Sequence, residues 1–84
     1  MSSPDPKEAI RDFILTEVLE TPDGDLADDA PLISDGLMNS LSTLKLVSFL
    51  EETFGIELAA HEISVKYLDS VGDIARFVEE KQAA

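Results

Sequence analysis

The sequence predicts an all-α fold, a small bundle of three longer helices and one short helix, with a long loop between the first and second helices. Three stretches repeat apolar residues at steps of three and four, which is the period of an amphipathic helix. Each of these stretches opens on a residue that caps helices well, and no stretch shows a credible strand pattern. Because 84 residues make one small domain, we expect residues 1–84 to form a single unit.

The first helix is predicted to begin at Asp5, a typical N-cap residue. Pro6 suits the first helical position, and Glu8 closes a capping box. The helix ends before Pro22, because the residue before a proline disfavours helical geometry. We interpret it as a packing element, with an apolar face made of Ile10, Phe13, Ile14, Leu15, Val18 and Leu19.

The segment 21–39 loses the helical period and is interrupted by prolines and glycines. A loop this long needs its own side chains to hold it in place, and the predicted anchors are Leu26, Leu32 and Ile33. Its five aspartates suggest calcium, but an EF-hand begun at Asp23 would place Asp28 where glycine is required. We therefore expect a solvated acidic loop and no metal site.

The second helix is predicted over residues 41–54, after Asn39 and Ser40, which are both good N-cap residues, and Gly55 is its stop signal. The Ser40 hydroxyl then lies at a helix N-terminus, where free N–H groups and the helix dipole favour a phosphate. Leu41 falls on the outward face, as a docking contact or as an ordinary exposed leucine. The predicted core stripe is Thr43, Leu46, Val47, Leu50 and Phe54, while Lys45, Ser48 and Glu52 face away from it.

The remaining chain predicts a short helix between Ala59 and about Tyr67, with Ile63 turned inward. A capping box at Ser70-Val71-Gly72-Asp73 then opens a last helix that runs to about Lys81 and is followed by a frayed end, 82–84. The inner stripe of this helix is Val71, Ile74, Ala75 and Val78.

Charge and composition limit the function. The net charge of −12 argues against nucleic acid or anionic membrane as a partner and favours partners with basic surfaces. The chain has no cysteine, so any thioester chemistry needs an imported thiol.

His61 is the only histidine and no nucleophile elbow surrounds Ser40, so we expect no catalytic residues and no enzyme activity. No apolar run is long enough for a membrane span and residues 1–5 lack signal-peptide features, which predicts a cytoplasmic protein.

The segment Gly36-Leu37-Met38-Asn39-Ser40-Leu41 resembles the Gly-Leu-x-[Asp/Asn]-Ser-Leu signature of the acyl carrier and peptidyl carrier protein family, and the resemblance extends over nearly the whole chain. It implies that Ser40 bears a covalent 4′-phosphopantetheine, with Gly36, Asn39 and Leu41 in the attachment site. A phosphopantetheinyl transferase would attach this arm from coenzyme A with Mg²⁺. The arm's thiol would hold acyl or aminoacyl groups as thioesters for a loading enzyme and a downstream acyltransferase or synthase.

The resemblance also implies a docking face on the second helix, formed by Met38, Leu41, Lys45, Ser48 and Glu52. Asn39 replaces the family's commoner aspartate, and Lys45 stands where fatty-acid carriers usually have an acid. These departures favour a free-standing, monomeric carrier of polyketide, nonribosomal peptide or aminoacyl-transfer biosynthesis over fatty acid synthesis, which stays an alternative. The alternative from another class is an unmodified acidic helical adaptor that binds a basic partner and uses Ser40 only as a helix cap.

Overall fold

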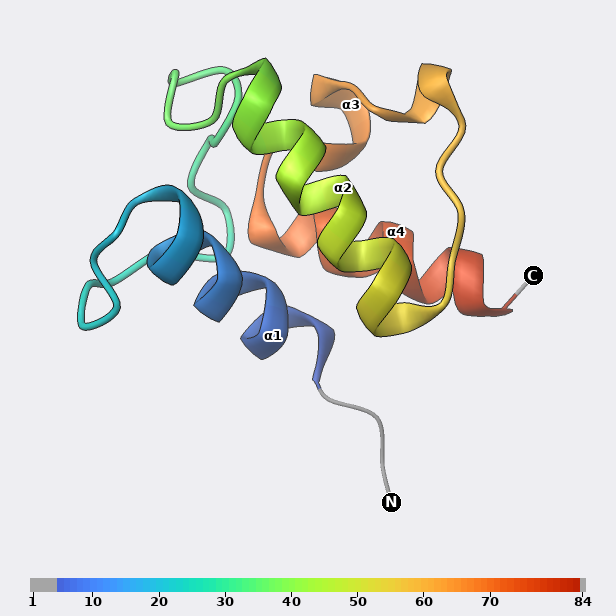
Figure 1. Cartoon of the computed structure of the whole chain (residues 1–84), viewed down its shortest axis with the longest axis horizontal. Helices are drawn as coiled ribbons and strands as arrows, with labels where there is room; N and C mark the ends of the chain where they lie inside the picture. The colour runs from blue at the N-terminus through green and yellow to red at the C-terminus, as the bar shows by residue number, and fades with distance from the viewer. Residues whose placement is uncertain (1–4, 84) are drawn as a thin grey trace.

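The computed structural model describes residues 5–83, and Figure 1 shows that this part of the chain is helical, with no strand. The predicted all-α class, with three longer helices, is confirmed. The first four residues and Ala84, including the region tested for a signal peptide, lie outside the described part. The elements are α1 (Pro6–Phe13), the π-helical turn η1 (Ile14–Val18), α2 (Ser40–Phe54), the 3-10 turn η2 (Ala60–Glu62), α3 (Val65–Leu68) and α4 (Val71–Ala83).

The first helix starts as predicted but ends differently. The Asp5 carboxylate caps α1 by accepting a hydrogen bond from the Lys7 N–H at 3.1 Å. The predicted capping box requires a bond from the Glu8 N–H instead, so Asp5 is the cap but the box does not form. After Phe13 the helix widens into η1, where the Leu19 N–H donates to the carbonyl of Ile14, five residues back, at 2.8 Å. The chain leaves this turn through Glu20, whose φ of 55° is in the left-handed region.

Helix α2 ends where predicted and has the predicted core face, but it begins at Ser40, one residue before the predicted start. It ends at Gly55, whose φ of 65° provides the left-handed cap that glycine adopts without strain. The five residues predicted for the core stripe are all buried: Thr43, Leu46, Val47, Leu50 and Phe54.

Helix α4 is the element against which α1, α2 and α3 all pack, and in Figure 1 it runs behind α2. Its predicted N-cap is confirmed, because the Ser70 Oγ accepts the Asp73 N–H at 3.0 Å, and its predicted inner stripe is buried. The predicted fraying of residues 82 and 83 is wrong, since α4 continues to Ala83 and the Gln82 side chain donates to the Phe54 carbonyl at 3.4 Å. No helix between residues 5 and 83 is long and apolar enough to cross a bilayer.

The long loop is held down at both ends. Leu26 and Leu32 are buried and Ile33 is half-buried, as predicted for its anchors. The Arg11 guanidinium pairs with Asp28 and donates to the Leu26 carbonyl at 3.0 Å, which joins the loop to α1. All five loop aspartates are exposed, in agreement with a solvated acidic loop.

The predicted single short helix is divided into two pieces. Ser64 adopts an extended conformation, with φ −154° and ψ 167°, and this separates η2 from the one-turn helix α3. Ile63 is half-buried between them, so its predicted inward orientation is only partly realised.

Candidate functional site around Ser40

Ser40 is the first residue of α2 and its side chain is exposed. The cap of this helix is Asn39, whose Oδ1 accepts the Ser42 N–H at 2.9 Å. The Ser40 hydroxyl makes no hydrogen bond within residues 5–83, so it is available to an incoming reagent. The role of helix cap that the adaptor alternative gave to Ser40 is therefore wrong, because Asn39 caps α2.

The electrostatic surroundings of Ser40 favour an anion. Helix α2 has 15 residues, and its first turn contains no acidic side chain. The N–H groups of Ser40 and Leu41 have no acceptor earlier in the helix, so they and the helix dipole present partial positive charge at this end. A phosphate linked to Ser40 would be stabilised by both.

The loop that leads into Ser40 is held by Asp69, which lies between α3 and α4. Its carboxylate accepts hydrogen bonds from the Ile33 and Ser34 N–H groups, both at 2.8 Å, and from the Ser34 hydroxyl. These bonds, led by the hydroxyl of Ser34, lower the pKa of Asp69. Its main-chain carbonyl accepts the Leu32 N–H at 2.6 Å, which completes the attachment.

The same loop closes on itself before it reaches Ser40. The Met38 N–H donates to the Leu32 carbonyl at 3.0 Å, and the Gly36 N–H donates to the Ile33 carbonyl at 3.1 Å. Gly36 has a φ of 78°, which other residues adopt only with strain, so this predicted site residue acts through the shape of the turn. The loop therefore holds the start of α2 in one place.

The structure corrects one residue of the predicted docking face. Met38 is only 2% exposed and belongs to the core, so no partner can contact it. Its neighbour Leu37 is 40% exposed and was missed, although it stands in the same motif. The other predicted docking residues are exposed: Leu41, Lys45, Ser48 and Glu52.

Exposed apolar side chains gather at the Ser40 end of the molecule. The large apolar residues that are exposed within the described part are Leu37, Leu41, Leu44 and Val65, at 40–65%. Leu44 lies one turn after Ser40, which is the sequence signal that could have identified it. A single exposed leucine needs no explanation, but a cluster at one end indicates a contact surface.

A pocket opens between the start of α2 and α3. Its volume is about 660 Å³, within the range of small-molecule sites, and its wall includes Ser40. The other wall residues are mostly apolar, and they include Leu44 from α2 and Val65 from α3. An extended, mostly apolar group attached at Ser40 could therefore lie in this pocket.

The family model of the phosphopantetheine attachment site matches residues 10–78. The match begins inside α1 and extends into α4, with the loop and the start of α2 between. The site described above fits a covalent phosphopantetheine. It has an exposed, unbonded hydroxyl, a helix N-terminus for the phosphate, and an adjacent apolar pocket for the rest of the arm.

Proposed function

The chain belongs to the phosphopantetheine attachment site family, whose members carry a covalently attached 4′-phosphopantetheine, and we propose that Ser40 is the residue that bears it. The observation that carries this proposal is the exposed Ser40 hydroxyl, which starts α2 without capping it. Its neighbours then have distinct parts. Asn39 caps the helix, Gly36 shapes the turn, and Leu41 stands beside the attachment point.

The proposed attachment transfers a phosphopantetheinyl group from coenzyme A to the Ser40 oxygen. A bond forms between the Ser40 Oγ and the phosphorus, and the pyrophosphate bond of coenzyme A breaks. Adenosine 3′,5′-bisphosphate leaves, and the hydroxyl proton goes to a base of the transferase. The arm supplies a thiol that this cysteine-free chain lacks, and acyl or aminoacyl groups are held there as thioesters.

The proposed docking surface for modifying and loading enzymes is the exposed apolar cluster of Leu37, Leu41, Leu44 and Val65. Leu44 and Val65 share a pocket wall with Ser40, and Leu37 and Leu41 lie within three residues of it in the chain, so an enzyme that covers this cluster has its own active site near Ser40. The chain itself performs no catalysis in this proposal. Its only histidine, His61, is exposed in η2 and has no part in the pocket beside Ser40.

We extend the proposal to the carrier's domain organisation, location, partner enzymes and pathway. Residues 1–84 act as one monomeric carrier domain in the cytoplasm, which serves a transferase, a loading enzyme and a downstream acyltransferase or synthase. Support for one unit comes from the core, which joins α1, the loop, α2 and α4 in a single cluster. The cap residue Asn39 and the exposed Lys45 favour polyketide, nonribosomal peptide or aminoacyl-transfer pathways, with fatty acid synthesis as the alternative.

The attachment is tested by intact mass. The apo protein is incubated with coenzyme A, Mg²⁺ and a broad-specificity phosphopantetheinyl transferase, beside Ser40→Ala and Ser48→Ala. Ser48 is a matched control, because it is an exposed serine on the same helix. We expect one added phosphopantetheinyl group on the wild type and on Ser48→Ala, and none on Ser40→Ala. A folded, unmodified wild type that gains no mass, or a gain that survives Ser40→Ala, refutes the proposal.

A further inference from the structure

A second, shallow concave surface lies along the seam of α2 with α1 and η1. It consists of two hollows of about 500 and about 320 Å³. Phe13, Glu17 and Phe49 line both hollows, so the two form one groove. We call this surface the aromatic groove and define it by Asp12, Phe13, Glu17, Phe49 and Glu52. None of these residues lines the pocket beside Ser40.

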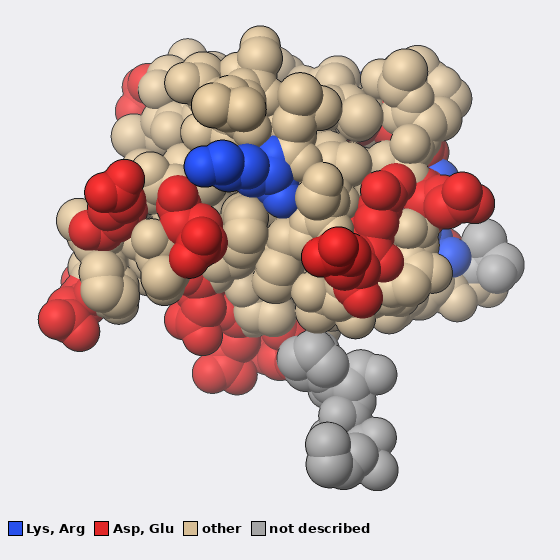
Figure 2. Space-filling view, in the orientation of Figure 1, with Lys and Arg blue, Asp and Glu red and all other residues tan. Residues whose placement is uncertain are grey.

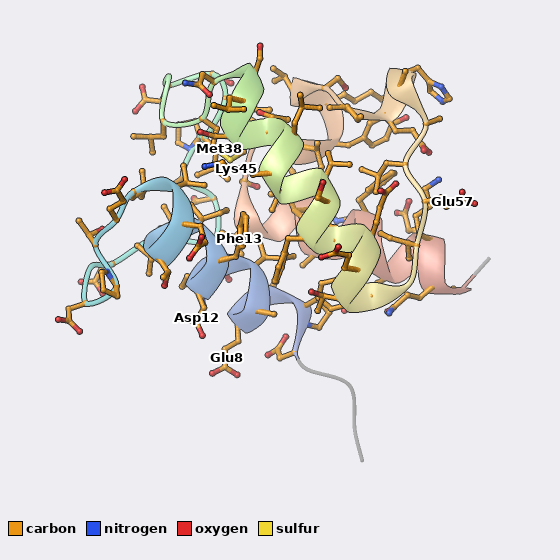
Figure 3. The ribbon with its side chains drawn as sticks, viewed as in Figure 1. Glu8, Asp12, Phe13, Met38, Lys45 and Glu57 are labelled. Atoms are coloured by element: carbon orange, nitrogen blue, oxygen red, sulfur yellow. The ribbon has the colours of Figure 1, made fainter. Side chains whose placement is uncertain are left out.

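The floor of the aromatic groove is a stacked aromatic pair. Phe13 from α1 and Phe49 from α2 are half-buried, and their rings stack with centroids 4.4 Å apart and planes 20° apart. Phe49 also meets the buried ring of Phe54 edge-on, at 6.3 Å and 89°. Figure 3 shows Phe13 between the two helices. Aromatic rings held in this way are typical of the energetic centre of protein interfaces, because they gain contact area without losing much side-chain freedom.

The wall on the α1 side is formed partly by the π-helical turn. Thr16 and Glu17 both belong to η1 and both line the groove. Such turns are rare, and they occur frequently at functional sites. Here the turn lies beside Phe13, at the place where the two hollows meet.

The rim of the aromatic groove is acidic. Asp12, Glu17 and Glu52 are exposed, and none of them forms an ion pair within residues 5–83. Among residues 5–83, Lys45 is the one basic residue on the wall of the groove. In Figure 2 acidic side chains stand on both sides of the basic side chain that Figure 3 labels as Lys45. An apolar floor inside an acidic rim is complementary to an apolar side chain flanked by basic ones.

We propose that the aromatic groove binds a basic amphipathic helix of a partner protein. An apolar side chain of that helix rests on the Phe13–Phe49 pair, and lysine or arginine side chains face Asp12, Glu17 and Glu52. A second copy of this chain does not fit, since it brings the same acidic rim and the same net charge of −12. Glu52 also belongs to the docking face predicted from the sequence, but the groove shares no lining residue with the pocket beside Ser40, so the partner leaves Ser40 accessible and its binding does not require the arm.

The probe is a synthetic helical peptide of about 18 residues, which spans about 27 Å. It carries leucines at steps of three and four and lysine or arginine on its other face. A second peptide has serine in place of each leucine, and a third is a scrambled isomer. Each is titrated into ¹⁵N-labelled protein at 0.15 M salt. We expect the amphipathic peptide to bind at least about tenfold more tightly than either control, with the largest amide shifts in η1 and around Phe13 and Phe49.

A charge-matched pair of variants tests the rim. The groove variant carries Asp12→Asn, Glu17→Gln and Glu52→Gln, and the control carries three neutralised glutamates elsewhere, Glu57→Gln, Glu79→Gln and Glu80→Gln. All six residues are exposed, so both proteins are expected to fold. The groove variant should lose about tenfold in affinity, while the control changes less than twofold.

Three outcomes overturn this inference. Equal losses in both variants would indicate attraction by net charge alone. Shifts centred on Leu41 and Val65 would place the peptide on the apolar cluster beside Ser40. A doubled protein mass at working concentration would make a second copy the occupant. Binding should persist unchanged in Ser40→Ala, so a failure of the phosphopantetheine proposal and a failure of this one are distinguishable.

Discussion

Replacing Asp69 should loosen the loop that positions Ser40. Its carboxylate accepts three hydrogen bonds from Ile33 and Ser34, and Asp69→Asn preserves its size but removes its charge. A hydrogen bond to a charged group contributes about 1 kcal/mol more than one between neutral groups. Because Ser34 is exposed, solvent reduces that difference. We expect the free energy of unfolding to fall by about 1–2 kcal/mol, which lowers Tm by about 5–15 °C in a domain of this size.

The pH dependence of that loss identifies its cause. The pKa of Asp69 is lowered in the folded protein, so its stabilisation is fully present above the unfolded pKa, near pH 4. It disappears as pH falls through the lower, folded value. Urea unfolding followed by circular dichroism should therefore show a gap between wild type and Asp69→Asn that is full at pH 7 and closes below about pH 4. Effects of net charge are common to both proteins and largely cancel in this difference.

Asp29→Asn is the matched control, because Asp29 is an exposed aspartate in the same loop and makes no hydrogen bond or ion pair within the described chain. It should unfold within about 0.5 kcal/mol of the wild type at every pH. Asp69→Asn should also slow phosphopantetheinylation at temperatures where it is still folded, since a freed loop no longer fixes the start of α2. A gap that is absent at pH 7, or that does not change with pH, would refute the reasoning.

Five further substitutions are tested by the same urea measurement. Gly55→Ala should lower the free energy of unfolding by about 1 kcal/mol, because φ is 65° and the added Cβ meets no atom within 4 Å, so backbone strain is the whole effect. Glu20→Gly should raise the free energy of unfolding by up to about 1 kcal/mol, because glycine adopts a φ of 55° without strain. Asn39→Ala should cost about 1 kcal/mol through loss of the cap bond to α2. Met38→Ala should cost about 2–5 kcal/mol, since its side chain is buried. Leu41→Ser should unfold within about 0.5 kcal/mol of wild type yet be phosphopantetheinylated more slowly, and a large loss of stability would place Leu41 in the core.

The longer helices were predictable because local rules and packing agree in them. In α2 the spacing of apolar residues identifies the buried face, and Gly55 ends the helix where a left-handed residue is needed. In α4 the Ser70 hydroxyl caps the backbone three residues later, a contact that depends only on neighbouring sequence. The position of Ser40 at the start of a helix follows from the same local rules.

The features that sequence did not reveal depend on contacts between distant segments. Asp69 and Ile33 are 36 residues apart, so nothing local marks Asp69 as the residue that holds the loop. The aromatic pair of Phe13 and Phe49 appears in the sequence as two core positions on separate helices. The π-helical turn has no glycine or proline to signal it, and it is recognisable only from the bond between Leu19 and Ile14.

The error at Met38 has a specific physical cause. The helical period applies from Ser40 onward, whereas Asn39 is extended, with φ −98° and ψ −174°. Side chains alternate between two sides in an extended segment, and the burial follows that alternation, with Leu37 and Asn39 exposed and Met38 buried. The resemblance grouped Met38 with residues of the second helix, but Met38 lies in the extended segment before that helix, where the helical period does not apply. Its burial has a consequence for the site, because a core side chain two residues before Ser40 fixes the start of α2 while the serine itself faces solvent.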